Sequence, residues 1–126
     1  MRYLTDRKRA VGKGASHSGT DHHWSMQLSS VALACLVPTW IYIFGSAIGL
    51  PRAEVVATFA RPFPAILTAL VLVVAMRHFA KGATMMIEDY AHGSARKIAV
   101  MSVISLSTVI AATGLYALIR ITLQVL

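Results

Sequence analysis

The sequence predicts an all-α membrane protein with three transmembrane helices. Apolar residues make up 56% of the 126 residues and charged residues 13%, whereas soluble domains average about 45–50% and about 25%. Three apolar segments approach or exceed the roughly 20 residues that cross a bilayer as a helix. We therefore divide the chain into a basic N-terminal segment, residues 1–24, and a three-helix membrane region, residues 25–126.

The N-terminal segment is polar and basic, so we expect an extended or partly disordered stretch over the membrane surface or over a partner. It contains His17, His22 and His23. We do not favour a metal site, because adjacent histidines on a helix cannot both point at one ion and no third type of ligand is nearby. The net charge of +7 does not indicate nucleic-acid binding either, since the basic residues cluster at chain ends and loops rather than along one polar face.

The first predicted span covers about residues 25–48. Trp24 precedes it as an aromatic anchor at the membrane interface, and Pro38 inside it predicts a kink. Cys35 is the single cysteine of the chain, so no disulfide forms within the chain and a small apolar packing role is expected.

The second predicted span runs from Pro64 to about Tyr90, after a loop in which residues 55–60 are expected to form a short interfacial helix. A proline suits the first turn of a helix. Residues 91–97 are predicted to be a short connection, with Gly93 breaking the helix. The third span covers about residues 98–123, and its small residues favour close helix packing.

The second span carries ionisable side chains inside its apolar run: Arg77, His78 and Lys81. Such residues are costly at membrane depth, which makes them functional-site candidates by default. The ordinary alternatives are a buried imidazole bonded to a neighbouring helix, and basic side chains that snorkel to the interface. Gly82 lies one turn after the histidine and would leave room for a flat ligand against the backbone.

Asp89 shares the helix face of His78, and Tyr90 lies beside it. At about 1.5 Å per residue, these two residues lie about 18 Å further along the helix, where the apolar run meets water. The ordinary alternatives are a solvated helix end for Asp89 and an interfacial aromatic anchor for Tyr90. One helix thus holds two candidate sites, one buried and one interfacial.

The spacing His-x(3)-Gly-x(6)-Asp-Tyr in the second of three spans resembles the small hydrophobic membrane anchor of bacterial succinate dehydrogenase. The resemblance extends over nearly the whole chain. It is carried by the motif of the second span and by the residues that lead into the first span: His78, Gly82, Asp89 and Tyr90, and Gly19, His22 and Trp24.

This resemblance implies that His78 is an axial ligand of a haem b whose second ligand comes from a partner subunit. It implies that Tyr90 hydrogen-bonds ubiquinone, with Asp89 beside it to orient a partner group, hold water or relay protons. Arg77 and Lys81 would then supply positive charge near the haem propionates or the quinone.

The implied function is that of a membrane anchor subunit of succinate:quinone oxidoreductase, respiratory complex II, in the bacterial inner membrane. Its expected partners are the second membrane anchor subunit, the iron–sulfur subunit, the flavoprotein subunit and the lipid bilayer. The chain would pass electrons to quinone without being catalytic alone, because it has no Gly-rich dinucleotide motif and no cysteine cluster.

One departure from the family concerns the first span. An arginine is common shortly after the aromatic residue in this family, and this chain has Gln27 instead, which puts in doubt a guanidinium from this helix for a haem propionate. Ser29 and Ser30 lie close by. Such residues usually bond their own backbone or a neighbouring helix; the functional alternative is that one of them faces the haem or quinone region.

Two further functions fit the composition. A small homo-oligomeric transporter would line its path with Arg77, His78 and Lys81, although the acidic residues expected of a cation-coupled pump are absent from the membrane interior. A structural tether would use the basic N-terminus to recruit a soluble partner. For all three functions, basic residues before the first span and at Arg96 and Lys97 predict a cytoplasmic N-terminus and a periplasmic C-terminus.

Overall fold

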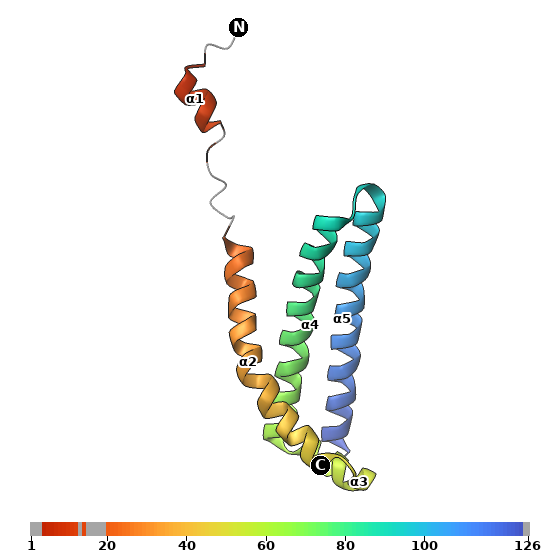
Figure 1. Cartoon of the computed structure of the whole chain (residues 1–126). Coiled ribbons are helices and arrows are strands. Elements are labelled where there is room, and N and C mark those ends of the chain that lie inside the picture. Colours follow the sequence, from red (N-terminus) through yellow and green to blue (C-terminus); the bar gives the residue numbers. More distant parts are fainter. Residues whose placement is uncertain (1–3, 13, 15–19, 125–126) are drawn as a thin grey trace.

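The computed structural model describes residues 4–12, 14 and 20–124, and this part of the chain is largely helical (Figure 1). Three of the helices are long and apolar enough to cross a membrane, which confirms the predicted fold class. The helices in chain order are α1 (Asp6–Val11), α2 (Asp21–Ala47), α3 (Arg52–Ala60), α4 (Pro62–Tyr90) and α5 (Gly93–Leu123).

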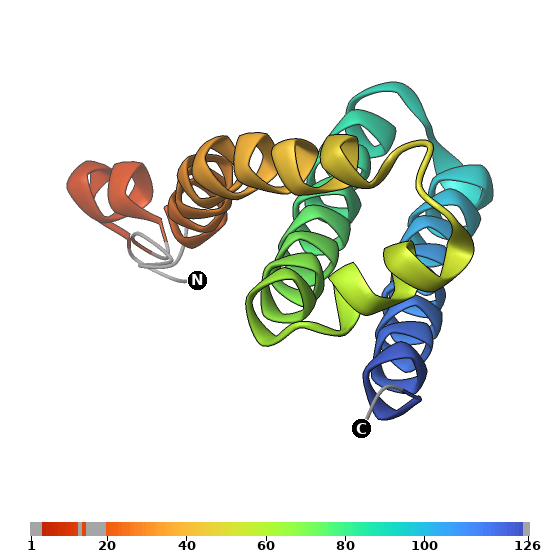
Figure 2. The same cartoon turned by 90° about the horizontal axis from the view of Figure 1, so that it is seen from below.

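Helix α4 is the centre of the bundle. It packs against both α2 and α5, whereas no Cα atom of α2 lies within 8 Å of one of α5 among the described residues. The short helix α3 contacts all three long helices and connects the end of α2 to the start of α4 (Figure 2). The helix with the ionisable side chains is therefore the one that both other spans hold in place.

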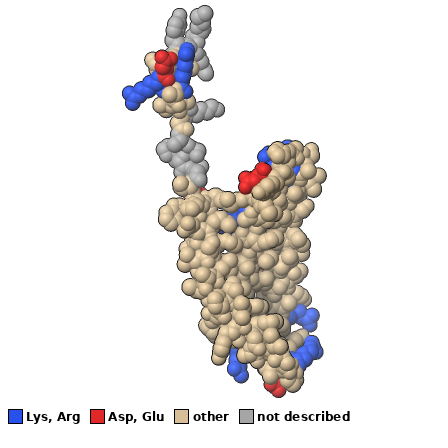
Figure 3. All heavy atoms as spheres, viewed as in Figure 1, with Lys and Arg blue, Asp and Glu red and all other residues tan. Residues whose placement is uncertain are grey.

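Few side chains are buried in this bundle. The buried apolar residues of the described chain are Ala47, Leu67 and Leu118, and the long helices turn many large apolar side chains outward. On the face shown in Figure 3, charged atoms gather mainly towards the two ends, and the surface between them is mostly uncharged. This distribution is the one that a lipid bilayer requires, since lipid solvates the apolar surface that water would not.

A tryptophan holds α2 to α4 near the end of the bundle where α3 lies. The indole Nε1 of Trp40 donates a hydrogen bond to Thr68 Oγ1 at 3.1 Å, and Thr68 donates in turn to the carbonyl of Pro64 at 2.7 Å. The Trp40 ring stacks on Phe44 with 4.9 Å between the ring centroids. Hydrogen bonds between membrane helices fix how the helices face one another.

The α4–α5 contact depends on a glycine. A Cβ atom on Gly114 would lie 2.4 Å from Leu72 Cδ2, closer than any real contact, so the leucine side chain packs directly on the α5 backbone. This agrees with the expectation that small residues of the third span serve close packing.

Several boundaries differ from the sequence predictions. The spans begin earlier than predicted, at Asp21, Pro62 and Gly93. The connection predicted at 91–97 shrinks to two residues, because Gly93, with φ of 63°, starts α5 rather than interrupting a helix. A helix that emerges into water continues through polar residues at little cost, so hydropathy alone places its ends too far inward.

The predicted short helix at residues 55–60 is confirmed as part of α3. Helix α2 continues through Pro38 without interruption, and it bends near its middle (Figure 1). The N-terminal segment, predicted to be extended or partly disordered, contains α1, capped by Thr5, whose hydroxyl accepts from Lys8 N at 3.3 Å. His17 and Gly19 lie outside the described residues.

The glycine contact leads to a prediction about stability. Gly114→Val should force Leu72 out of its place and lower the stability of the assembled protein by about 1–3 kcal/mol, the usual cost of overpacking. Gly45→Val is the matched control, because a Cβ there meets nothing within 4 Å. The thermal midpoint of the purified protein measures both, and equal midpoints for the two variants would contradict the assigned packing.

The fold also makes the topology testable. Three crossings put the two ends of the membrane region on opposite sides of the bilayer, and the basic residues favour a cytoplasmic N-terminus. A reporter active only in the periplasm should be active when fused after Leu126 and inactive when fused after His92. The reversed pattern of activity would show that the chain inserts the other way round.

Candidate functional site

Four polar side chains meet between α2 and α4: Ser25, Ser29, His78 and Lys81. We call them the α2–α4 polar cluster. Ser29 Oγ lies 2.8 Å from His78 Nδ1, and Lys81 Nζ donates to Ser25 Oγ. All four are half-buried. Because the two helices run antiparallel, a step of four residues along α2 matches a step of three back along α4, so one face of each helix supplies both pairs.

The imidazole of His78 uses one of its two ring nitrogens inside this chain. Its Nδ1 faces Ser29, and no hydrogen bond to Nε2 is formed by any residue that the structure describes. A half-buried imidazole with one nitrogen engaged and the other open is the usual arrangement of a histidine that binds a metal ion or a haem iron. This placement suits the role of a ligand, for which the depth of His78 in the span made it a candidate.

The basic side chains near His78 have no acidic partner among residues 4–12, 14 and 20–124, where the ion pair found is Arg9 with Asp6 at 3.7 Å. Lys81 reaches a neutral hydroxyl instead. A charge inside the membrane region is expensive unless an opposite charge compensates it. No described residue supplies a compensating anion for Lys81.

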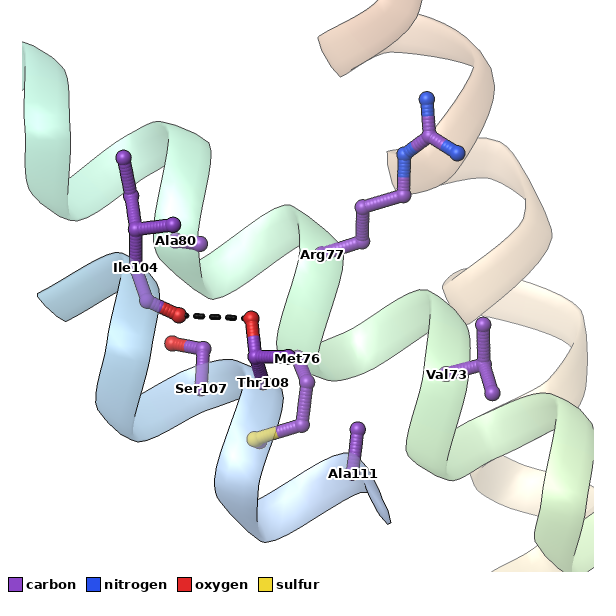
Figure 4. Close-up of a pocket in the computed structure, with 8 residues that line it drawn as sticks. All are labelled: Val73, Met76, Arg77, Ala80, Ile104, Ser107, Thr108 and Ala111. Carbon is purple, nitrogen blue, oxygen red and sulfur yellow. Dashed lines mark hydrogen bonds between the residues drawn. The ribbon is translucent and has the colours of Figure 1, made fainter.

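Arg77 makes no hydrogen bond with the α2–α4 polar cluster in the structure. It borders a cavity of about 290 Å³ between α4 and α5, together with Ser107 and Thr108. Figure 4 shows its guanidinium pointing away from these two residues, while Thr108 bonds the carbonyl of Ile104 at 2.8 Å. Arg77 is exposed and Lys81 half-buried. The two basic residues therefore differ in their exposure to the surroundings of this chain.

Gly82 does not border an open space. A Cβ atom there would lie 3.6 Å from Met26 Cε, an ordinary van der Waals contact, so a side chain of α2 covers this glycine. The room that the sequence suggested beside this glycine is therefore partly filled by Met26.

The interfacial candidates occupy the last turn of α4. Asp89 and Tyr90 are both exposed, Tyr90 to 83%, and neither makes a hydrogen bond with its side chain to any described residue. Helix α4 is unbroken from Pro62 to Tyr90, so the distance of about 18 Å from His78 holds. The buried and interfacial candidates are thus two separate places, and the second is open to another subunit.

The structure distinguishes between the two serines that the sequence left open. Ser29 faces His78, whereas Ser30 is exposed and bonds the carbonyl of Met26 at 2.9 Å. Gln27 is also exposed, with its Nε2 3.4 Å from the imidazole of His23, and does not join the polar cluster. Ser25 was not singled out from the sequence; its spacing of four residues from Ser29 is the signal that would have found it.

The chain matches the family model described as succinate dehydrogenase/fumarate reductase transmembrane subunit over residues 1–113. It belongs to this family. A curated relative, the succinate dehydrogenase hydrophobic membrane anchor subunit of Paracoccus denitrificans, is 46% identical over 123 residues, which cover 98% of this chain and 95% of the relative. No solved structure matches the chain.

Membership of this family makes the chain a multi-pass membrane anchor of a succinate dehydrogenase or fumarate reductase complex. The catalytic complex therefore includes other subunits. Of the three functions weighed from the sequence, the match favours the anchor subunit over a transporter. It also explains why the bundle leaves so much of α2, α4 and α5 uncovered, because an anchor is one part of a larger assembly.

Proposed function

We propose that this chain is the membrane anchor subunit of a bacterial succinate:quinone oxidoreductase in the inner membrane, where it helps to hold haem b and ubiquinone. The observation that carries the proposal is the placement of His78. It lies in the interior of a transmembrane helix, half-buried, with Nδ1 bonded to a neighbouring span and Nε2 without a protein partner among the described residues.

His78 would bind the haem iron through its free ring nitrogen. His78 is the histidine that lies deep in a span, whereas His22 and His23 lie in the first turn of α2 and His92 lies in the α4–α5 connection. The second axial ligand would therefore come from the second membrane anchor subunit. When bound, haem b supplies one-electron transfer, and two imidazole ligands close its iron to oxygen.

Lys81 and Arg77 would hold the propionates of the haem or add a positive field near the quinone. Lys81 lies three residues after His78 and lacks an acidic partner in the part of the chain that the structure describes. A propionate carboxylate would supply the missing negative charge. Arg77 is exposed, so it would meet a propionate or a partner subunit at the surface of this chain.

Tyr90 would donate its hydroxyl to a carbonyl oxygen of ubiquinone at the cytoplasmic surface. Reduction adds two electrons and two protons to the quinone, and a donor at that oxygen stabilises the charge that develops there. Asp89 beside it would orient a partner group, hold water or relay protons. The exposure of both side chains leaves them free to meet the quinone and the iron–sulfur subunit.

The soluble subunits would dock over this same surface. With one cysteine and no Gly-rich dinucleotide motif, the chain leaves the iron–sulfur and flavin chemistry to the iron–sulfur subunit and the flavoprotein subunit. The basic N-terminal segment and the α4–α5 connection would lie under them, so electrons would travel a short way from an iron–sulfur centre to the quinone.

The haem assignment is tested by His78→Ala in the assembled complex. Loss of one axial ligand should abolish or distort the visible spectrum of the low-spin b-type haem. His92→Ala is the control, because His92 lies in the α4–α5 connection and is exposed, and it should keep the wild-type spectrum. An assembled His78→Ala complex with an unchanged spectrum would remove His78 from the haem site.

The quinone assignment is tested by Tyr90→Phe, which deletes the hydroxyl and keeps the ring. Quinone reductase turnover should fall at least severalfold, though less than the ~10²–10³ typical of a sole donor, because a partner chain would retain a second donor. Haem content and electron transfer to an artificial acceptor fed by the soluble subunits should change little.

Tyr116→Phe is the matched control for this measurement, since Tyr116 is an exposed tyrosine of α5 far from the end of α4 in sequence. Its quinone reductase turnover should stay at the wild-type level. If Tyr90→Phe also reduced ubiquinone with wild-type turnover and affinity, Tyr90 would be an interfacial anchor and the quinone would bind elsewhere.

A further inference from the structure

We propose that Ser29 is a positioning residue that holds His78 in the tautomer with its proton on Nδ1, so that the lone pair of Nε2 is the one presented to iron. This inference rests on the proposed function, because it specifies how His78 would serve as an axial ligand. It adds a residue of α2, and a role for the α2–α4 contact, to a site otherwise built on α4.

The hydroxyl of Ser29 has more polar neighbours than it has protons. Ser29 Oγ lies 2.9 Å from the carbonyl oxygen of Ser25, 2.9 Å from that of Met26 and 2.8 Å from His78 Nδ1. A serine hydroxyl has one proton and two acceptor lone pairs. Carbonyl oxygens only accept, so the hydroxyl proton is best placed towards them, and the oxygen then accepts from Nδ1–H.

The opposite tautomer fits these distances poorly. If Ser29 donated its proton to Nδ1, its oxygen would face two carbonyl oxygens at 2.9 Å with no proton between them. Three electron-rich oxygens would then repel one another in a region of low dielectric, where such contacts cost most. The geometry therefore favours Nδ1–H donating to Ser29, which leaves Nε2 deprotonated.

The neighbouring pair of the polar cluster does not compete for this hydroxyl. Lys81 has only protons to donate and gives one to Ser25 Oγ, one turn before Ser29. Each α4 side chain thus has its own α2 serine. Ser30 is exposed and bonds only the carbonyl of Met26, so it has no part in holding the imidazole.

The consequence for a bound haem follows from ligand chemistry. A histidine whose second ring nitrogen donates a hydrogen bond has a fixed orientation and is a more basic ligand. A more basic ligand stabilises ferric over ferrous iron. The Ser29 hydroxyl, itself polarised by its bond to a backbone carbonyl, should therefore lower the haem midpoint potential and slow the loss of haem.

The test compares Ser29→Ala with Ser30→Ala in the complete membrane complex. Both changes delete a hydroxyl that bonds back to the helix, but the first also removes the acceptor for His78. Ser29→Ala should keep a low-spin b-type haem whose midpoint potential rises, by up to about 59 mV for a tenfold loss of ferric preference. It should also lose haem in detergent about tenfold faster. Removing the hydrogen-bond partner of a metal-bound histidine usually weakens the binding of the metal by about that factor or more.

Ser29→Thr supplies the rescue. A threonine hydroxyl in a helix also bonds the carbonyl four residues earlier, so it restores the acceptor and should return the potential towards the wild-type value. Ser30→Ala should match the wild type. Should Ser29→Ala fail to assemble, Ser29→Cys keeps the volume, supplies only a weak acceptor and should show the same upward shift.

Three outcomes would overturn the inference. The first is a haem midpoint potential of Ser29→Ala or Ser29→Cys equal to that of the wild type. The second is an equal shift of the potential in Ser30→Ala. The third is a Ser29→Thr potential as far from the wild-type value as that of Ser29→Ala, which would assign the effect to packing. In each case haem lost in His78→Ala would leave the proposed function standing. If the wild-type complex held no b-type haem, or His78→Ala kept it unchanged, the haem part of the proposed function would itself fail.

Discussion

His78 and Lys81 lie inside a membrane helix, where water cannot readily solvate them, and two serines of α2 supply the hydrogen bonds that the structure shows for them. An unpaired polar group in that setting costs several kcal/mol by the usual estimate. The pairing of α2 with α4 is therefore fixed by more than apolar packing. A shift of one residue along either helix would leave both the imidazole and the ammonium without their partners.

This constraint extends along the whole contact. Trp40 and Thr68 bond near the α3 end, and the serine pairs bond towards the end where α2 begins, so the two spans are tied on both sides of the bend in α2. On its other face α4 packs by shape, with Gly114 admitting Leu72. Polar bonds set the register on one side of α4, and close backbone approach sets the distance on the other.

The bundle is complete enough to orient the site and too open to enclose it. One nitrogen of His78 is held by this chain and the other has no hydrogen-bond partner among the described residues, while Asp89 and Tyr90 are exposed at the end of α4. Under the proposed function, a subunit that shares its cofactor and substrate with neighbours would need this division. Its own helices would fix the direction of each side chain, and the partners in the complex would supply the remaining ligands and exclude water.

The sequence alone determined the three spans, the candidate residues of α4 and the family, because hydropathy depends on composition and a motif on spacing along one helix. It placed the starts of the first and third spans too late, because the structure starts these helices at Asp21 and Gly93. Polar turns outside the bilayer carry little hydropathy signal. Only the tertiary structure decided that Ser29 rather than Ser30 faces His78, that Ser25 meets Lys81 and that Arg77 borders a pocket between α4 and α5. Those facts depend on how two helices are rotated against each other, and no pattern within a single helix contains that rotation.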